Sequence, residues 1–185
     1  MTRPRVGFLG VGWIGRHRMQ AILETGVVEA AAIADPSPEM AAEAGQLAPG
    51  ARPVDTLGTM LDMGLDGVVI ATPSALHAEQ SILALRRGAA VFCQKPLGRT
   101  AAEAQAVVEA ARRADRLLAV DLSYRFTDGM RRIRDLVRAG ALGRECALFF
   151  MFVTVRGARP VRKSRAHPAP PPRLRCRRAA IAGCR

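Results

Sequence analysis

Three glycines near the amino terminus have the spacing of a phosphate-binding turn. In residues 5–15, RVGFLGVGWIG, a short apolar segment runs into Gly10, Gly12 and Gly15 and then into residues with helical spacing. Gly10 would allow a sharp turn, Gly12 a close approach of the backbone to a pyrophosphate, and Gly15 tight packing of the helix on the strand. The free N–H groups at the start of such a helix point at the anion. The pattern therefore predicts a dinucleotide-binding turn.

A carboxylate follows at the distance that such a turn requires. Asp35 ends the next apolar segment, residues 27–34, and lies 20 residues after Gly15. A carboxylate there can accept hydrogen bonds from both hydroxyls of an adenosine ribose and would repel a 2'-phosphate, which favours NAD over NADP. The run 35–39, DPSPE, also suits a helix N-cap at Asp35, and the two roles are compatible.

Two further clusters come directly after apolar segments. Residues 72–77, TPSALH, place His77 in the first turn of a helix, where the alternative is an exposed or capping side chain. Residues 92–97, FCQKPL, place Lys95 where a strand ends, and a lysine there could polarise or protonate a substrate oxygen. Lys95 is the only lysine before Lys163, which favours function over an ordinary solvated side chain.

A parallel sheet covered by helices would bring these residues together, and the apolar pattern predicts one. Strands are expected at 6–9, 27–34, 67–71, 89–93 and 117–121, and helices at 13–23, 38–47, 60–63, 75–87 and 100–113. The expected fold is α/β, a doubly wound parallel sheet of about six strands, the NAD(P)-binding Rossmann fold. Ligands lie outside the carboxyl ends of such strands, where Gly10, Asp35, Thr72, Gln94 and Ser123 fall.

The pattern divides the chain into three parts. Residues 1–122 form the expected dinucleotide-binding domain, and residues 123–153 the incomplete start of a second α/β domain. That start holds a helix at 128–139, whose apolar stripe is expected to face inward, and an apolar strand at 146–153. The stripe consists of Met130, Ile133, Leu136 and Val137. Residues 154–185 are a basic Pro/Arg-rich tail, expected to be disordered.

The net charge of +12 comes almost entirely from this tail, since residues 1–155 carry +2 and residues 156–185 carry +10. The abrupt change in composition suggests a shift of reading frame near 153–156, so that the chain is truncated. A basic tail could instead bind nucleic acid by releasing counterions, but this one has no aromatic residues to stack on bases. A zinc site from His167, Cys176 and Cys184 fits no common finger spacing.

The remaining composition indicates an intracellular globular protein. The chain shows no export signal and no membrane span, so we expect a cytoplasmic protein whose four cysteines are reduced thiols. No metal is expected. The oligomeric state is left open.

Taken in order, the glycine turn, Asp35-Pro36, Thr72-Pro73 with His77, 94–96 (QKP) and 124–126 (YRF) resemble the Gfo/Idh/MocA oxidoreductases, the glucose-fructose oxidoreductase and inositol dehydrogenase group. The resemblance covers roughly residues 4–153. It implies a Rossmann domain followed by an α/β domain with an open sheet for substrate and oligomer contacts. It identifies Lys95 with the family's catalytic lysine. The residues that it places at the cofactor are Gly10, Gly12, Trp13, Ile14, Gly15, Asp35, Thr72, Pro73, Ser74, His77, Gln94 and Lys95.

The chain departs from the family pattern at two points. Gln94 stands where the family usually has glutamate, which changes the charge beside the cofactor. The family's second catalytic group, a histidine a few residues after an aspartate, has no counterpart, because no aspartate follows Asp135. We therefore expect an NAD(P)-dependent oxidoreductase that transfers hydride between the nicotinamide and a sugar or cyclitol hydroxyl carbon, competent in binding but impaired in catalysis. The alternatives are a non-catalytic dinucleotide-binding protein and a nucleic-acid binder acting through the tail.

Overall fold

The computed structural model describes residues 2–141 of the chain. Several sequence-based predictions lie outside the described residues. They are the apolar strand at 146–153, the disorder of the basic tail, the shift of reading frame, nucleic-acid binding through the tail and the zinc site at His167, Cys176 and Cys184.

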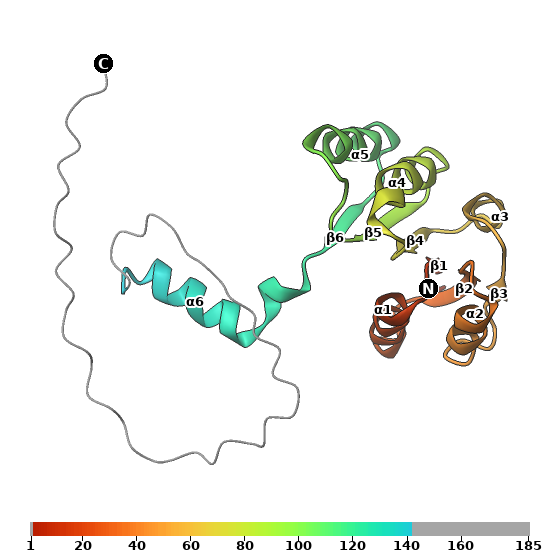
Figure 1. Cartoon of the computed structure of the whole chain (residues 1–185), viewed down its shortest axis with the longest axis horizontal. Coiled ribbons are helices and arrows are strands. Elements are labelled where there is room, and N and C mark those ends of the chain that lie inside the picture. The colour runs from red at the N-terminus through yellow and green to blue at the C-terminus, as the bar shows by residue number, and fades with distance from the viewer. Residues whose placement is uncertain (1, 142–185) are drawn as a thin grey trace, which may run out of the picture. The chain divides into compact units, whose positions relative to one another are not determined.

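Within the described residues a six-stranded parallel sheet has the order β3-β2-β1-β4-β5-β6 (Figure 1). The strands are β1 (Arg5–Leu9), β2 (Glu29–Ala34), β3 (Arg52–Pro53), β4 (Gly67–Ile70), β5 (Ala90–Gln94) and β6 (Leu118–Asp121). The chain runs outward from β1 to β3, then returns to the other side of β1 with β4. This reversal between β1 and β4 is the switch point at which doubly wound sheets bind ligands, and it confirms the predicted fold class.

Helices cover both faces of the sheet. Figure 1 shows α1 (Trp13–Glu24) and α2 (Pro38–Gly45) on one face, and α3 (Leu57–Leu61), α4 (His77–Arg86) and α5 (Ala101–Ala114) on the other. A 3-10 turn, η1 (Ser74–Leu76), precedes α4, and a second one, η2 (Ser123–Phe126), precedes α6 (Asp128–Arg138). The helix predicted at 75–87 is therefore divided at His77.

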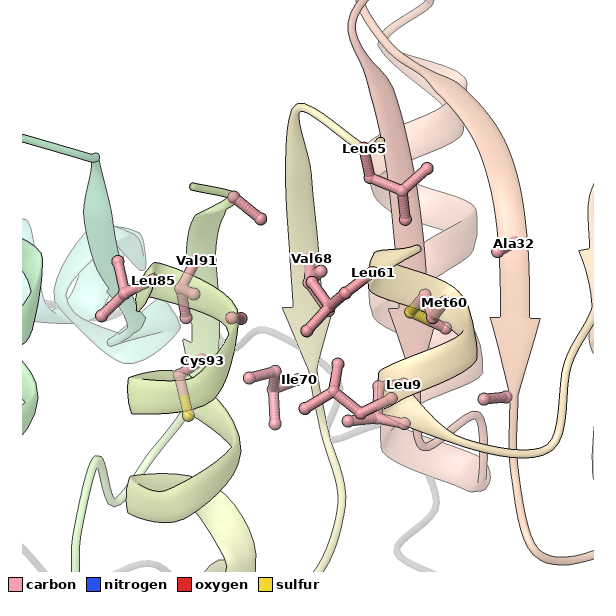
Figure 2. Packing of buried hydrophobic residues seen from close by; sticks show 14 of the residues in the cluster. Leu9, Ala32, Met60, Leu61, Leu65, Val68, Ile70, Leu85, Val91 and Cys93 are labelled. Atoms are coloured by element: carbon pink, nitrogen blue, oxygen red, sulfur yellow. The ribbon is translucent and has the colours of Figure 1, made fainter. Parts of the chain in front are cut away.

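The apolar core lies in two layers, one on each face of the sheet. On the α3–α5 face, Leu9, Val68 and Ile70 of the strands lie beside Met60 and Leu61 of α3 (Figure 2). The other layer forms between the strands and the helices α1 and α2; its buried members are Phe8, Val11, Met19, Ala30, Ile33, Ala44 and Val69. Because both faces are covered, the inner strands read as continuous apolar runs.

The helix α6 differs from its prediction. Met130, Ile133 and Leu136 are only half-buried and Val137 is exposed, so none of the stripe is buried within the described structure. The reason is that α6 follows the last strand, and its main described contacts are with η2 rather than with the sheet layers. Among residues 2–141, no helix is long and apolar enough to span a membrane.

Candidate functional site

The glycine turn connects β1 to α1 through close backbone contacts. Gly10 has a φ of +79°, and its N–H donates to the carbonyl of Ala34 at 2.8 Å. A Cβ on Gly10 would lie 2.7 Å from the Thr72 nitrogen. A Cβ on Gly15 would overlap the carbonyl oxygen of Gly10 and lie 2.9 Å from its carbonyl carbon. Both glycines are therefore required by the fold itself.

Gly12 has a different environment, because a Cβ there would meet no described atom within 4 Å. Its φ of −58° is also open to any residue. Gly12 is the N-cap of α1, and so this helix begins without a side-chain cap. The helices α2, α3, α5 and α6 are instead capped by the hydroxyls of Ser37, Thr56, Thr100 and Thr127. The start of α1 is therefore left open to an external anion.

Asp35 lies just past the carboxyl end of β2 and is tied to the glycine turn. One carboxylate oxygen accepts a hydrogen bond from the Val11 N–H at 2.7 Å, and the other accepts from the Ser37 N–H at 2.9 Å. The N-cap of α2 is Ser37, whose hydroxyl accepts from the Met40 N–H at 3.3 Å. The interpretation of Asp35 as a helix N-cap is therefore wrong. The carboxylate lines a hollow of about 690 Å³ together with Pro36, Pro38, Ala41, Val54 and Asp55.

A second hollow, of about 630 Å³, lies where β5 and β6 end. Gln94 lines it from the last position of β5, Lys95 from just beyond that strand, and Trp13 and Ile14 from the start of α1. The Lys95 side chain is exposed, and its backbone N–H donates to the Gln94 side-chain oxygen at 2.8 Å. Of the predicted site residues, this hollow thus brings together Trp13, Ile14, Gln94 and Lys95, whereas the three glycines do not line it. Trp13, the single tryptophan of the chain, is 70% exposed beside it.

The residues predicted after β4 separate into two environments. Thr72 is half-buried and its hydroxyl donates to the Gln80 side-chain oxygen at 2.5 Å, whereas Pro73 and Ser74 are exposed. His77 is buried, with 1% of its surface exposed. Its ring nitrogens contact the carbonyl oxygens of Pro96, at 2.6 Å, and Thr72, at 2.7 Å. The alternative of an exposed or capping histidine is therefore wrong.

Sequence reasoning missed an ion pair beside the second hollow. The Arg18 guanidinium on α1 donates to the Asp121 carboxylate at the end of β6, and also to the Ser123 hydroxyl at 3.1 Å. Asp121 is only 6% exposed, so it depends on this cation for compensation. The only sequence signal for this ion pair was an acidic residue at the last position of an apolar strand. Its partner lies 103 residues away along the chain.

Cys93 lies next to Gln94 but takes no exposed position. The thiol is fully buried, and burial raises its pKa to about 11. It donates to the Gln94 carbonyl at 3.3 Å. A neutral, buried thiol is a core residue rather than a nucleophile.

Comparison with known proteins places this geometry in a family. Residues 4–122 match the oxidoreductase family with an NAD-binding Rossmann fold, Gfo/Idh/MocA. The rhizopine catabolism protein MocA of Rhizobium meliloti is 39% identical over 145 residues, which are 77% of this chain and 45% of that protein.

Two solved structures are similar to the chain. One is the WlbA dehydrogenase of Bordetella pertussis in complex with NADH and UDP-GlcNAcA, with a TM-score of 0.70, 31% identity and coverage of 77% of this chain and 41% of that one. The other is KijD10, a 3-ketoreductase of Actinomadura kijaniata in complex with NADP, with a TM-score of 0.69, 28% identity and coverage of 77% and 46%.

The chain thus spans less than half the length of each of these proteins. The matched region contains the whole sheet and the glycine turn. The fold is therefore an NAD(P)-binding Rossmann fold, and the chain belongs to the Gfo/Idh/MocA oxidoreductase family.

Proposed function

We propose that the chain binds NAD across the carboxyl ends of its strands, with the adenosine at Asp35 and the nicotinamide near Lys95. The observation that carries the proposal is the position of the two hollows on either side of the glycine turn. Between them, α1 begins at Gly12 without a side-chain cap and with open space in front of it. A pyrophosphate in that space would receive the N–H groups and the positive end of the helix dipole.

The hollow of about 690 Å³ at Asp35 is the adenosine hollow of this proposal, and the charges that line it favour NAD over NADP. Asp35 and Asp55 line it, and its described lining residues include no lysine or arginine. A 2'-phosphate there would meet two carboxylates without a compensating cation. The Asp35 oxygens are engaged by the N–H groups of Val11 and Ser37, but a carboxylate accepts up to four hydrogen bonds. It therefore keeps capacity for the ribose hydroxyls.

We propose hydride transfer with a sugar or cyclitol hydroxyl carbon as the family's chemistry for this domain. Bound NAD would supply the hydride acceptor. The exposed Lys95 would hold the substrate oxygen and stabilise the negative charge that develops there as the hydroxyl proton passes to solvent water. The proposal extends to the substrate class and the turnover of the complete protein. Gln94, which lines the same hollow as Lys95, would lie beside the cofactor.

The test is a titration of the full chain with NADH and NADPH. Trp13 is the only tryptophan of the chain and lines the hollow of about 630 Å³ at Lys95, where the nicotinamide would bind. Energy transfer from its emission to the reduced nicotinamide therefore reports binding directly. We expect saturable transfer with NADH and a Kd at least about tenfold weaker for NADPH. Absence of saturable transfer with both dinucleotides would refute the proposal.

Two aspartate variants test the cofactor preference. Asp35→Ser keeps a hydrogen-bond acceptor but removes the charge, and we expect it to weaken NADH and to narrow the difference from NADPH. Asp55→Ser is the comparison variant, because Asp55 is an exposed acid in the same hollow with no described bond to the glycine turn. We expect it to strengthen NADPH binding by removing one of the two carboxylates, without weakening NADH. Equal weakening of NADH by the two substitutions would show that Asp35 does not hold the ribose. If the chain binds dinucleotide but no polyol reduces the bound NAD, the alternative of a non-catalytic dinucleotide-binding protein would be favoured.

A further inference from the structure

We propose that His77 is a positioning residue that joins the loop bearing Lys95 to the loop at Thr72, and so sets the nicotinamide side of the site. The proposal rests on the proposed function for the identity of that side. The two contacts themselves are within the chain.

The position of His77 explains how one ring can reach both loops. It is the first residue of α4, at the turn where η1 ends. Thr72 comes just after β4 and Pro96 just after β5, and these strands are neighbours in the sheet. The buried ring lies between the two exits, with its Nε2 at 2.7 Å from the Thr72 carbonyl oxygen and its Nδ1 at 2.6 Å from the Pro96 carbonyl oxygen.

The chemistry of these contacts distinguishes His77 from an ordinary core histidine. Both partners are carbonyl oxygens, which only accept hydrogen bonds. Any hydrogen bond in these two contacts is therefore donated by the ring, and its two nitrogens face one acceptor on each loop. The charged residues nearest along the two segments, Glu79 and Lys95, are both exposed, and neither is a described hydrogen-bond partner of the ring.

The contact with Pro96 bears directly on Lys95. The lysine loop is held on one side by the Gln94 side chain, which accepts a hydrogen bond from the Lys95 N–H. On the other side it is held by the contact between His77 and the Pro96 carbonyl oxygen. Loss of the ring would release the second attachment. We expect the Lys95 ammonium and the 72–74 loop to move, while the adenosine hollow keeps its structure because His77 has no described contact with it.

The chain offers a specific reporter of the Lys95 loop. It has two lysines, so in a Lys163→Arg background reductive 13C-methylation labels Lys95 and the N-terminal amine alone. We compare His77→Leu, which keeps bulk without donors, with His77→Gln, whose amide carries two N–H groups. Ser81→Ala is the control, because Ser81 is also buried and lies one turn further along α4. We expect His77→Leu to shift or broaden the Lys95 methyl signal, and the other two variants to leave it close to that of the parent.

Affinities separate positioning from general damage. ADP-ribose occupies the adenosine and pyrophosphate positions but lacks the nicotinamide. We expect His77→Leu to weaken NADH about tenfold while changing ADP-ribose less than about twofold, and His77→Gln to recover most of the loss. Equal weakening of both ligands by a folded His77→Leu, or an unchanged Lys95 signal, would overturn the proposal. If His77→Leu does not fold, the comparison is between His77→Gln and Ser81→Ala. A Lys95 methyl signal that is shifted or broadened in His77→Gln but not in Ser81→Ala, or a much weaker NADH affinity of His77→Gln, would overturn the proposal.

Failure of the proposed function gives a different result. In that case the parent protein binds neither NADH nor ADP-ribose. The Lys95 signal still tests the attachment of the lysine loop, because it requires no ligand.

Discussion

Two alanine substitutions in the glycine turn should have opposite consequences. Gly12 and Gly15 lie three residues apart in the same motif, and the sequence pattern assigns the approach to the pyrophosphate to Gly12 and the packing of the helix on the strand to Gly15. In the structure, a Cβ at Gly15 meets the backbone of Gly10, whereas a Cβ at Gly12 meets no described atom. We expect Gly15→Ala to cost stability and Gly12→Ala to cost cofactor affinity.

The magnitude for Gly15→Ala follows from the overlap. The new methyl group would lie 2.9 Å from the Gly10 carbonyl carbon and closer to its oxygen, well inside the 3.4 Å of an ordinary contact. A backbone carbonyl cannot rotate away as a side chain can, so we expect the upper part of the usual range for overpacking, about 3 kcal/mol. With roughly 3–4 °C per kcal/mol for a domain of this size, the Tm should fall by about 10 °C.

For Gly12→Ala the terms in the free energy of unfolding nearly cancel. Alanine restricts the unfolded chain, which stabilises by about 0.4–1 kcal/mol, and it is a poorer N-cap than glycine by a similar amount. The stability should therefore stay within about 1 kcal/mol. The methyl group would occupy the space in front of α1. Loss of one charge-assisted hydrogen bond to a phosphate, worth about 1.5–3 kcal/mol, weakens NADH by about ten- to a hundredfold.

Urea unfolding followed by circular dichroism measures the stabilities, and isothermal titration calorimetry measures the affinities. Calorimetry is preferred because Trp13 adjoins Gly12, so the substitution could alter its emission. The reasoning is refuted if Gly12→Ala binds NADH like the parent, or if Gly15→Ala unfolds at the same urea concentration.

Three further predictions concern residues around the site. Arg18→Ala leaves the buried Asp121 carboxylate without its cation and should lower the free energy of unfolding by about 2–3 kcal/mol in urea titrations, whereas an unchanged value would mean that water replaces the guanidinium. Burial raises the pKa of Cys93 from 9.0 to about 11, so the folded chain keeps a proton that the unfolded chain releases. Stability should fall as the pH rises from 9 to 11, and Cys93→Ala should flatten that slope in chemical denaturation. Thr100→Ala removes the hydroxyl that accepts from the Glu103 N–H at 3.1 Å and should cost about 1 kcal/mol, with no change in NADH affinity.

Much of the fold could be predicted from the sequence because its signals are local. The alternation of strand-like and helix-like apolar segments predicted the parallel sheet. The predicted ends of five of its six strands lie within two residues of the observed ends. The strand β3 was missed because Arg52 and Pro53 are two exposed residues without apolar periodicity, and only pairing with β2 makes them a strand. The start of α4 was misplaced because a 3-10 turn and an α-helix share the same residue preferences over one turn.

The candidate site divides in the same way. The sequence by itself determined the glycine turn and Asp35, because their spacing is set by one strand, one turn and one helix. Only the tertiary structure decided that Ser37 caps α2 while Asp35 holds the Val11 N–H, and that the atoms that exclude a Cβ at Gly15 belong to the Gly10 carbonyl. The burial of His77 and the pairing of Arg18 with Asp121 were also beyond the sequence. Both depend on groups from separate helices, strands and loops that meet only when the sheet and its helices assemble. Side-chain type does not reveal a partner that is distant along the chain.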